Sequence, residues 1–133
     1  MGQIPKVTAS TLKRIAGVSG KQYKKVTWHS TTITVKQFLP INDYMNLVKH
    51  IIDDCSDNDD GVVVGLVDFA FKVNVVASYS FIELPKDIND MYYIICVSDL
   101  FETISSAINR NQLNSIANIV EGVTGVRVWR QPG

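Results

Sequence analysis

Apolar residues recur at helical spacing between residues 44 and 55, and this stripe constrains the fold more than any other feature of the sequence. It consists of six side chains: Tyr44, Leu47, Val48, Ile51, Ile52 and Cys55. Such spacing is typical of a helix that packs one face against a core. Asn42 is a favourable N-cap residue, and Asp43 places a negative charge at the positive end of the helix. The sequence therefore predicts a helix that begins after Asn42 and buries this stripe.

Three later segments show the same periodicity. The first places apolar side chains at Leu66, Phe69, Ala70, Val73, Val76 and Ala77. Its valines favour a strand, but its length favours a helix. In the second, Ser98 is a candidate cap for a helix, and the inner face is formed by Leu100, Phe101, Ile104, Ala107 and Ile108. After a turn at residues 109–111, a short helix that ends at Gly122 presents Leu113, Ile116, Ala117 and Val120. We therefore expect a mostly helical chain.

Two short alternating segments, residues 25–29 and 32–36, are rich in β-forming residues and predict a β-hairpin. Residues 126–129 predict a possible last strand. A chain of 133 residues has the size of one domain. The fold class expected is α+β: a mostly helical single domain with a small N-terminal β-hairpin and a possible C-terminal strand. We divide the chain into a basic N-terminal arm (1–23), an α+β core (24–125) and a C-terminal strand or tail (126–133).

Charge is distributed unevenly although the formal net charge is zero. Residues 1–42 contain seven basic and no acidic residues, whereas residues 43–102 contain three lysines and twelve acidic residues, a net charge of −9. This layout favours contact between the basic segment and an acidic body, either by folding back within one chain or by association with a protein partner. Nucleic acid is a less favoured partner, because the basic segment offers only Tyr23 and Trp28 for stacking on bases.

Residues near the two ends are the candidates for protein contact. They are basic or aromatic: Lys13, Arg14, Lys21, Trp28, Arg127, Trp129 and Arg130. Each tryptophan is equally consistent with an interface anchor and with a lid over the core. Residues 8–16 predict a short helix in the arm, with a thin apolar face of Leu12 and Ile15. We expect residues 1–22 and the stretch after Gly125 to be ordered by a partner, because they bury too little surface alone.

No pattern of metal-binding residues stands out, and we expect neither a metal nor a cofactor. If Gly61 is taken as the glycine of a calcium loop, Ser56 and Val67 fall where the loop needs carboxylates. The four potential zinc ligands contain no closely spaced pair; they are His29, His50, Cys55 and Cys96.

Nucleophilic catalysis is not indicated either, and we expect no enzyme and no small-molecule substrate. Cys55 follows Asp53 and Asp54, whose charges disfavour a thiolate. Phosphate-binding glycine motifs and a serine elbow are absent from the sequence. No apolar run is long enough to span a bilayer, no secretory signal is visible, and two cysteines are typical of a reducing compartment.

Several segments between residues 24 and 120 resemble small virion structure and assembly proteins of tailed bacteriophages. They are Val26-Thr27-Trp28-His29, Phe38-Leu39-Pro40 with Tyr44 to Val48, Asp68 to Lys72, Leu84-Pro85 and Ser98 to Glu102. The resemblance implies a non-enzymatic protein of the capsid, neck or tail, or an assembly chaperone, located in the virion or the host cytoplasm. It transfers no functional residue to this chain.

We therefore expect a protein–protein interaction module that contacts itself or other virion proteins, without nucleic acid or membrane. The alternative is a phage-encoded inhibitor of a host defence nuclease that uses the acidic segment as a nucleic-acid mimic. The inhibitor requires the acids to line one face, whereas the virion protein requires arms ordered on neighbours.

Overall fold

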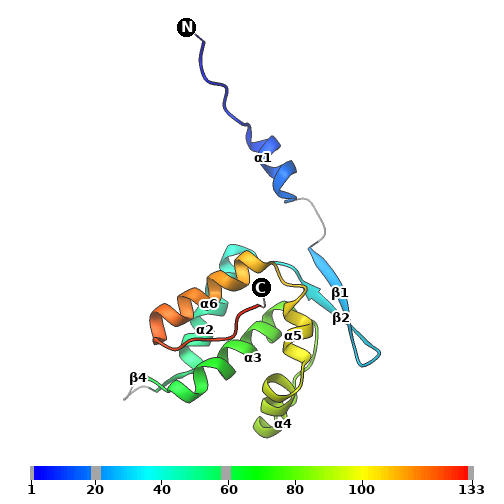
Figure 1. The fold of residues 1–133 in the computed structure, drawn as a ribbon, viewed down its shortest axis with the longest axis vertical. Coiled ribbons are helices and arrows are strands. Elements are labelled where there is room, and N and C mark those ends of the chain that lie inside the picture. The colour runs from blue at the N-terminus through cyan, green and yellow to red at the C-terminus, as the bar shows by residue number, and fades with distance from the viewer. Residues whose placement is uncertain (1, 19–21, 58–60, 132–133) are drawn as a thin grey trace.

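The fold combines a bundle of helices with a small β-hairpin, as the computed structural model shows for residues 2–18, 22–57 and 61–131 (Figure 1). The elements in chain order are α1 (Ala9–Ala16), β1 (Tyr23–Trp28), β2 (Thr31–Lys36), α2 (Ile41–Asp54), β3 (Ser56–Asp57), β4 (Gly61–Val62), a 3-10 turn (Val64–Leu66), α3 (Val67–Tyr79), α4 (Ile88–Tyr92), a π-helical turn (Tyr93–Val97), α5 (Leu100–Ser105) and α6 (Arg110–Thr124). The expected α+β, mostly helical single domain is confirmed.

The predicted hairpin is present, with β1 and β2 paired antiparallel and joined by two residues. His29 and Ser30 form that loop with φ angles of 47° and 64°, the left-handed backbone of the tight turn that matches strand twist, although neither is glycine. Ile33 and Val35 point into the core and are buried. Val35 also forms a bridge with Ser80 at the end of α3, which attaches the hairpin to the helical body.

Helix α2 carries the predicted stripe, but it begins earlier than expected. Leu47, Ile51 and Cys55 are buried, and the other three stripe residues pack half-buried against the core. The N-cap assignment of Asn42 is wrong. The Pro40 carbonyl already accepts a hydrogen bond from the Tyr44 amide at 2.9 Å, so the helix begins at Ile41 without a side-chain cap.

The segment predicted as a helix from its length is helix α3, which begins at Val67 and buries only part of the predicted stripe. Its buried residues are Val67, Ala70, Phe71, Val75, Val76 and Tyr79. Leu66 and Ala77 of the expected stripe are exposed. The reason is that α3 contacts α2, α5, α6 and the π-helical turn. A helix covered from several directions is apolar on most sides, so periodicity does not identify its inner face.

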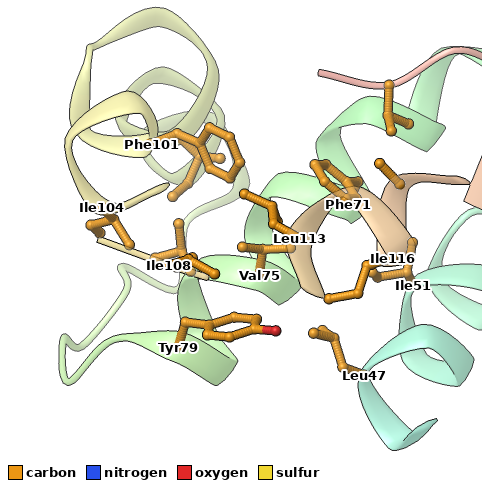
Figure 2. Close-up of a cluster of buried hydrophobic side chains, with 14 of the residues drawn as sticks. Leu47, Ile51, Phe71, Val75, Tyr79, Phe101, Ile104, Ile108, Leu113 and Ile116 are labelled. Atoms are coloured by element: carbon orange, nitrogen blue, oxygen red, sulfur yellow. The ribbon is translucent and has the colours of Figure 1, made fainter. Parts of the chain in front are cut away.

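Helices α5 and α6 complete the core with the residues expected of them. All nine predicted inner-face residues, from Leu100 to Val120, are buried. Helix α5 is shorter than predicted and ends at Ser105, so Ala107 and Ile108 are buried from the turn that follows it. Figure 2 shows Phe101 and Ile104 of α5 and Leu113 and Ile116 of α6 around the side chains of α2 and α3. The cap assignment of Ser98 is wrong, because Asp99 is the N-cap residue of α5 and makes no side-chain cap hydrogen bond. Ser98 Oγ still accepts from the Leu100 amide at 3.3 Å.

Two boundaries of α6 differ from the sequence expectation. Asn109 does not continue a turn but caps the helix, because its Oδ1 accepts from the Gln112 amide at 2.9 Å. The helix passes Gly122 and ends at Gly125, whose φ of 73° is a left-handed conformation that favours glycine.

Gln112 holds the α6 start to two other parts of the body. Its Oε1 accepts from the Leu39 amide at 2.7 Å and from the Tyr79 hydroxyl at 2.5 Å. Its Nε2 donates to the Leu39 carbonyl at 3.0 Å. Burial strongly raises the pKa of Tyr79, which keeps its hydroxyl a donor. The side-chain amide of Gln112 therefore provides hydrogen-bond partners for the backbone of Leu39, just before α2, and for the Tyr79 hydroxyl at the end of α3.

The expectation that the residues after Gly125 form a C-terminal strand or a free tail is wrong. In the described part of the chain, residues 126–131 pair with no strand. They lie extended over the helices, and Val128 is buried. The Val128 amide donates to Glu121 Oε1 and the Trp129 amide to Asp68 Oδ1, each at 3.1 Å. Contacts within the same chain therefore order this segment, because acidic side chains on α3 and α6 accept its amide hydrogens.

Candidate interaction surfaces

Helix α1 forms without burying any residue. Thr8 caps its first turn, since its Oγ1 accepts from the Thr11 amide at 3.2 Å. Gly17 ends it with a φ of 75°, and its amide donates to the Arg14 carbonyl at 3.3 Å. A helix of eight residues is marginal in water when nothing packs against it. Its sequence therefore specifies a helix that a contact with another surface would stabilise.

The large apolar residues in the described part of the arm before β1, residues 2–18, are all exposed. Their exposed fractions run from 55% to 91%, for Ile4, Val7, Leu12, Ile15 and Val18. Figure 1 shows α1 and the residues before it projecting away from the body, on the far side from α4. Lys13 and Arg14 are also exposed and lie in the last turn of α1, where their charges suit the helix dipole. The arm thus presents an apolar face flanked by basic groups. Lys21 lies outside the described residues.

Trp28 connects the hairpin to the start of α5. Its Nε1 donates to Asp99 Oδ1 at 2.7 Å, and the side chain packs half-buried against the core. The His29 ring meets it edge-on with centroids 4.9 Å apart. In this chain Trp28 therefore has the position of a core lid.

Trp129 and Arg130 have similar positions at the C-terminal end. The Trp129 ring meets Phe101 edge-on at 4.9 Å. Arg130 Nη2 lies 2.7 Å from Glu121 Oε2 and 2.7 Å from Asn118 Oδ1. Arg127, in contrast, is exposed. The structure thus brings Trp129 and Arg130 together on the body and leaves Arg127 at the surface.

An apolar groove, which we call the α3–α4 groove, lies between the first half of α3 and α4 and encloses about 280 Å³. Its apolar lining is Leu66, Phe69, Ala70, Val73, Ile88 and Met91, and its charged lining is Asp54 and Lys86. Phe69 meets Tyr92 edge-on at 5.7 Å, which holds α4 against α3. Ile88 is 65% exposed at the rim.

The charges in the lining of the α3–α4 groove are balanced, with one aspartate against one lysine. Asp54 lines it, and Asp87 and Asp90 are adjacent in sequence to lining residues of α4. Asp87 caps α4 by accepting from the Asn89 and Asp90 amides at 2.9 and 3.0 Å. Lys86 is the opposing charge in the lining. The sequence analysis did not single out this groove, because α4 has only five residues and shows no readable periodicity.

The thiols show no sign of activation. Burial raises the pKa of Cys55 and of Cys96, which disfavours the nucleophilic thiolate. Within residues 2–18, 22–57 and 61–131, no three His, Cys, Asp or Glu side chains gather in a way that could hold a metal ion. A search of the same residues finds no helix with the length and apolar character needed to cross a membrane.

Comparisons with known proteins add no relative. A scan against protein-family models, a search of curated proteins and a search of solved structures each found no match to this chain.

Proposed function

We propose that this protein is a non-enzymatic protein–protein interaction module that self-associates through its N-terminal arm, residues 2–18, as a structural or assembly component of a tailed-phage virion. The observation that carries the proposal is α1. It is capped at both ends by its own sequence, yet Leu12 and Ile15 remain 57% and 72% exposed. Exposed apolar faces of this kind mark interaction sites.

Charge supports contact between copies of the chain. The arm belongs to a segment of residues 1–42 with seven basic and no acidic groups, and residues 43–102 carry −9. In such a pairing the apolar face supplies affinity, while the opposite charges steer encounter and fix the register. The virion setting comes from the resemblance of residues 24–120 to phage virion and assembly proteins.

Sedimentation velocity over the micromolar range tests the self-association. The full chain should associate with rising concentration, and the double variant Leu12→Asp/Ile15→Asp should remain a monomer. The matched control is Met45→Asp/Val123→Asp, which makes the same charge change at exposed apolar positions of α2 and α6. A wild-type chain that stays monomeric, or a double variant that associates as the control does, would refute the proposal.

The virion setting has its own test. Mass spectrometry of purified particles should detect the protein if it is a structural component, and deletion of its gene should lower particle yield in either role. Particles that lack the protein and form normally without its gene would contradict the virion assignment.

A further inference from the structure

A pair of exposed aromatic rings lies on the β-hairpin. The centroids of the Tyr23 and Phe81 rings are 6.0 Å apart, and the two residues are 53% and 59% exposed. Phe81 follows α3 in the sequence and reaches the hairpin because its amide donates to the Thr34 carbonyl of β2 at 3.1 Å. Large apolar side chains that gather at the surface in this way mark a binding site.

The register of the hairpin shows which residues share a face with this pair. Side chains alternate along a strand, and Ile33 and Val35 are buried, so the other set of side chains forms the outer face. Its members, which we call the outer face of the hairpin together with Phe81, are Tyr23, Lys25, Thr27, Thr32, Thr34 and Lys36. Helix α5 lies against the inner face, where Trp28 donates to Asp99. Figure 1 shows the hairpin at one side of the helical body.

The outer face is basic next to its aromatic rings. Lys36 pairs with Tyr23 across the two strands, and its Nζ lies 5.5 Å from the centroid of the Phe81 ring. Lys25 is exposed and lies on the same face. None of the six strand residues is acidic, and Glu83 is the nearest acidic residue to Phe81 in the sequence. The two lysines therefore remain in excess even when Glu83 is counted.

Rings beside ammonium groups fit single-stranded nucleic acid better than a protein partner. The six strand residues of the outer face include no valine, leucine, isoleucine or methionine, so the face lacks aliphatic area for the core of a protein interface. Aromatic rings stack on bases, and lysines beside them neutralise phosphates. The bases of a duplex are already stacked on one another and have no free faces for the rings. The chemistry of the face thus selects a polyanion with unstacked bases.

The stacking groups differ from those that the sequence offered. Tyr23 and Trp28 were the two candidates in the basic segment, and nucleic acid was less favoured because they were only two. Trp28 points to the inner face, where Asp99 accepts its indole hydrogen at 2.7 Å. Phe81 takes its place beside Tyr23, and no local sequence signal connects these two residues.

We propose that the outer face of the hairpin binds single-stranded nucleic acid, with Tyr23 and Phe81 stacked on bases and Lys25 and Lys36 in contact with phosphates. This binding goes beyond the proposed self-association and does not depend on it, because none of these residues belongs to the arm, residues 2–18.

Fluorescence anisotropy of the full chain with a labelled oligothymidylate of about 16 nucleotides tests the stacking. Tyr23→Leu/Phe81→Leu keeps two apolar side chains but removes the rings, and it should weaken binding at least about tenfold. Tyr92→Leu/Tyr93→Leu, which removes two rings exposed elsewhere on the body, is the matched control and should bind as wild type does. A duplex of the same length should bind more weakly than the single strand. Thermal denaturation shows whether each variant is folded.

A salt titration tests the phosphate contacts and does not depend on the aromatic variant. Lys25→Gln/Lys36→Gln should lower the slope of log K against log salt by about 1.4, since each phosphate contact on a single strand contributes about 0.7. Lys49→Gln/Lys86→Gln removes the same charge at exposed positions outside the hairpin and should leave the slope unchanged.

Each remaining outcome overturns the proposal. A wild-type chain that does not bind the oligonucleotide refutes it directly. A folded aromatic variant that binds like wild type, or a duplex bound as tightly as the single strand, shows an electrostatic contact without stacking. Displacement by polyglutamate as efficient as by unlabelled oligonucleotide shows that the partner is an acidic protein. If Lys13→Gln/Arg14→Gln abolishes binding while both hairpin variants bind like wild type, the arm is the site. Sedimentation velocity should give the same association for the hairpin variants as for wild type, so failure here leaves the proposed self-association untouched.

Discussion

Replacing Gln112 with leucine tests how the body holds the chain segment that leads into α2. The substitution removes three hydrogen bonds, to the Leu39 amide, the Leu39 carbonyl and the Tyr79 hydroxyl. Each bond contributes about 1 kcal/mol net, and a buried group left without a partner costs about 1–3 kcal/mol. Because Leu39 and Tyr79 are buried and leucine is apolar, we expect a loss of about 2–4 kcal/mol in the free energy of unfolding.

Chemical denaturation of a double-mutant cycle measures the coupling. Tyr79→Phe alone removes one bond and should cost about 1 kcal/mol. In the Gln112→Leu background the same change should cost less, because the phenol has already lost its acceptor. Asn111→Leu, at the exposed neighbouring position of α6, is the matched control and should change stability by less than about 0.5 kcal/mol. Additive losses in the cycle, or a Gln112→Leu variant as stable as the control, would refute the role of Gln112.

Three further predictions concern the core, the C-terminal segment and the thiols. Leu47→Ala and Ile51→Ala should each lower the free energy of unfolding by about 2–5 kcal/mol, and unchanged denaturation midpoints would show that this face of α2 is not core. Trp129→Ala should cost about 2–3 kcal/mol, since the half-buried indole loses its contact with Phe101, whereas Arg127→Ala at an exposed position should have little effect. Equal stability of these two variants would contradict the packing of the C-terminal segment. Burial raises the pKa of Cys55 and Cys96, so alkylation by iodoacetamide at pH 8 should be slower than for a small free thiol and should accelerate as the pH rises. A rate equal to that of the free thiol would be inconsistent with this environment.

The helices that pack one face on the core could be read from the sequence. The stripes of α2, α5 and α6 were assigned to their inner faces because a single buried face leaves a clear period of 3.6 residues. The same reasoning predicted α3 as a helix but identified only part of its buried surface, because neighbouring elements cover several of its sides. Helix starts were less predictable. Pro40 initiated α2 through its backbone carbonyl, which no side-chain preference reveals.

The C-terminal segment could not be predicted from local sequence. Its position depends on two acidic side chains that accept its amide hydrogens. Asp68 is 61 residues from Trp129 along the chain, and Glu121 lies on α6. Such contacts follow from the tertiary fold and leave no periodic signal. The α3–α4 groove was missed for the same reason, since it joins residues of two helices that the sequence does not place side by side.

The interaction candidates divide according to burial. Lys13, Arg14 and Arg127 are exposed, whereas Trp28, Trp129 and Arg130 have partners within the chain. The composition of the arm, basic with few apolar groups, was the signal that separated it from the body. The segment after Gly125 is also basic, so its composition resembles that of the arm. Only its hydrogen bonds to Asp68 and Glu121 show that it belongs to the body.

The most direct measurement of the central claim compares the full chain with one that begins at Gln22, which keeps the Gln22 carbonyl that accepts from the Gln37 amide. Sedimentation equilibrium gives the mass of each, and circular dichroism gives its thermal midpoint. Since residues 2–18 are almost entirely exposed, the shortened chain should keep the helical spectrum and midpoint of the full chain. It should also be a monomer at concentrations where the full chain associates. A shortened chain that unfolds, or that associates as tightly as the full chain, would contradict the claim that the arm is an interaction element outside the core.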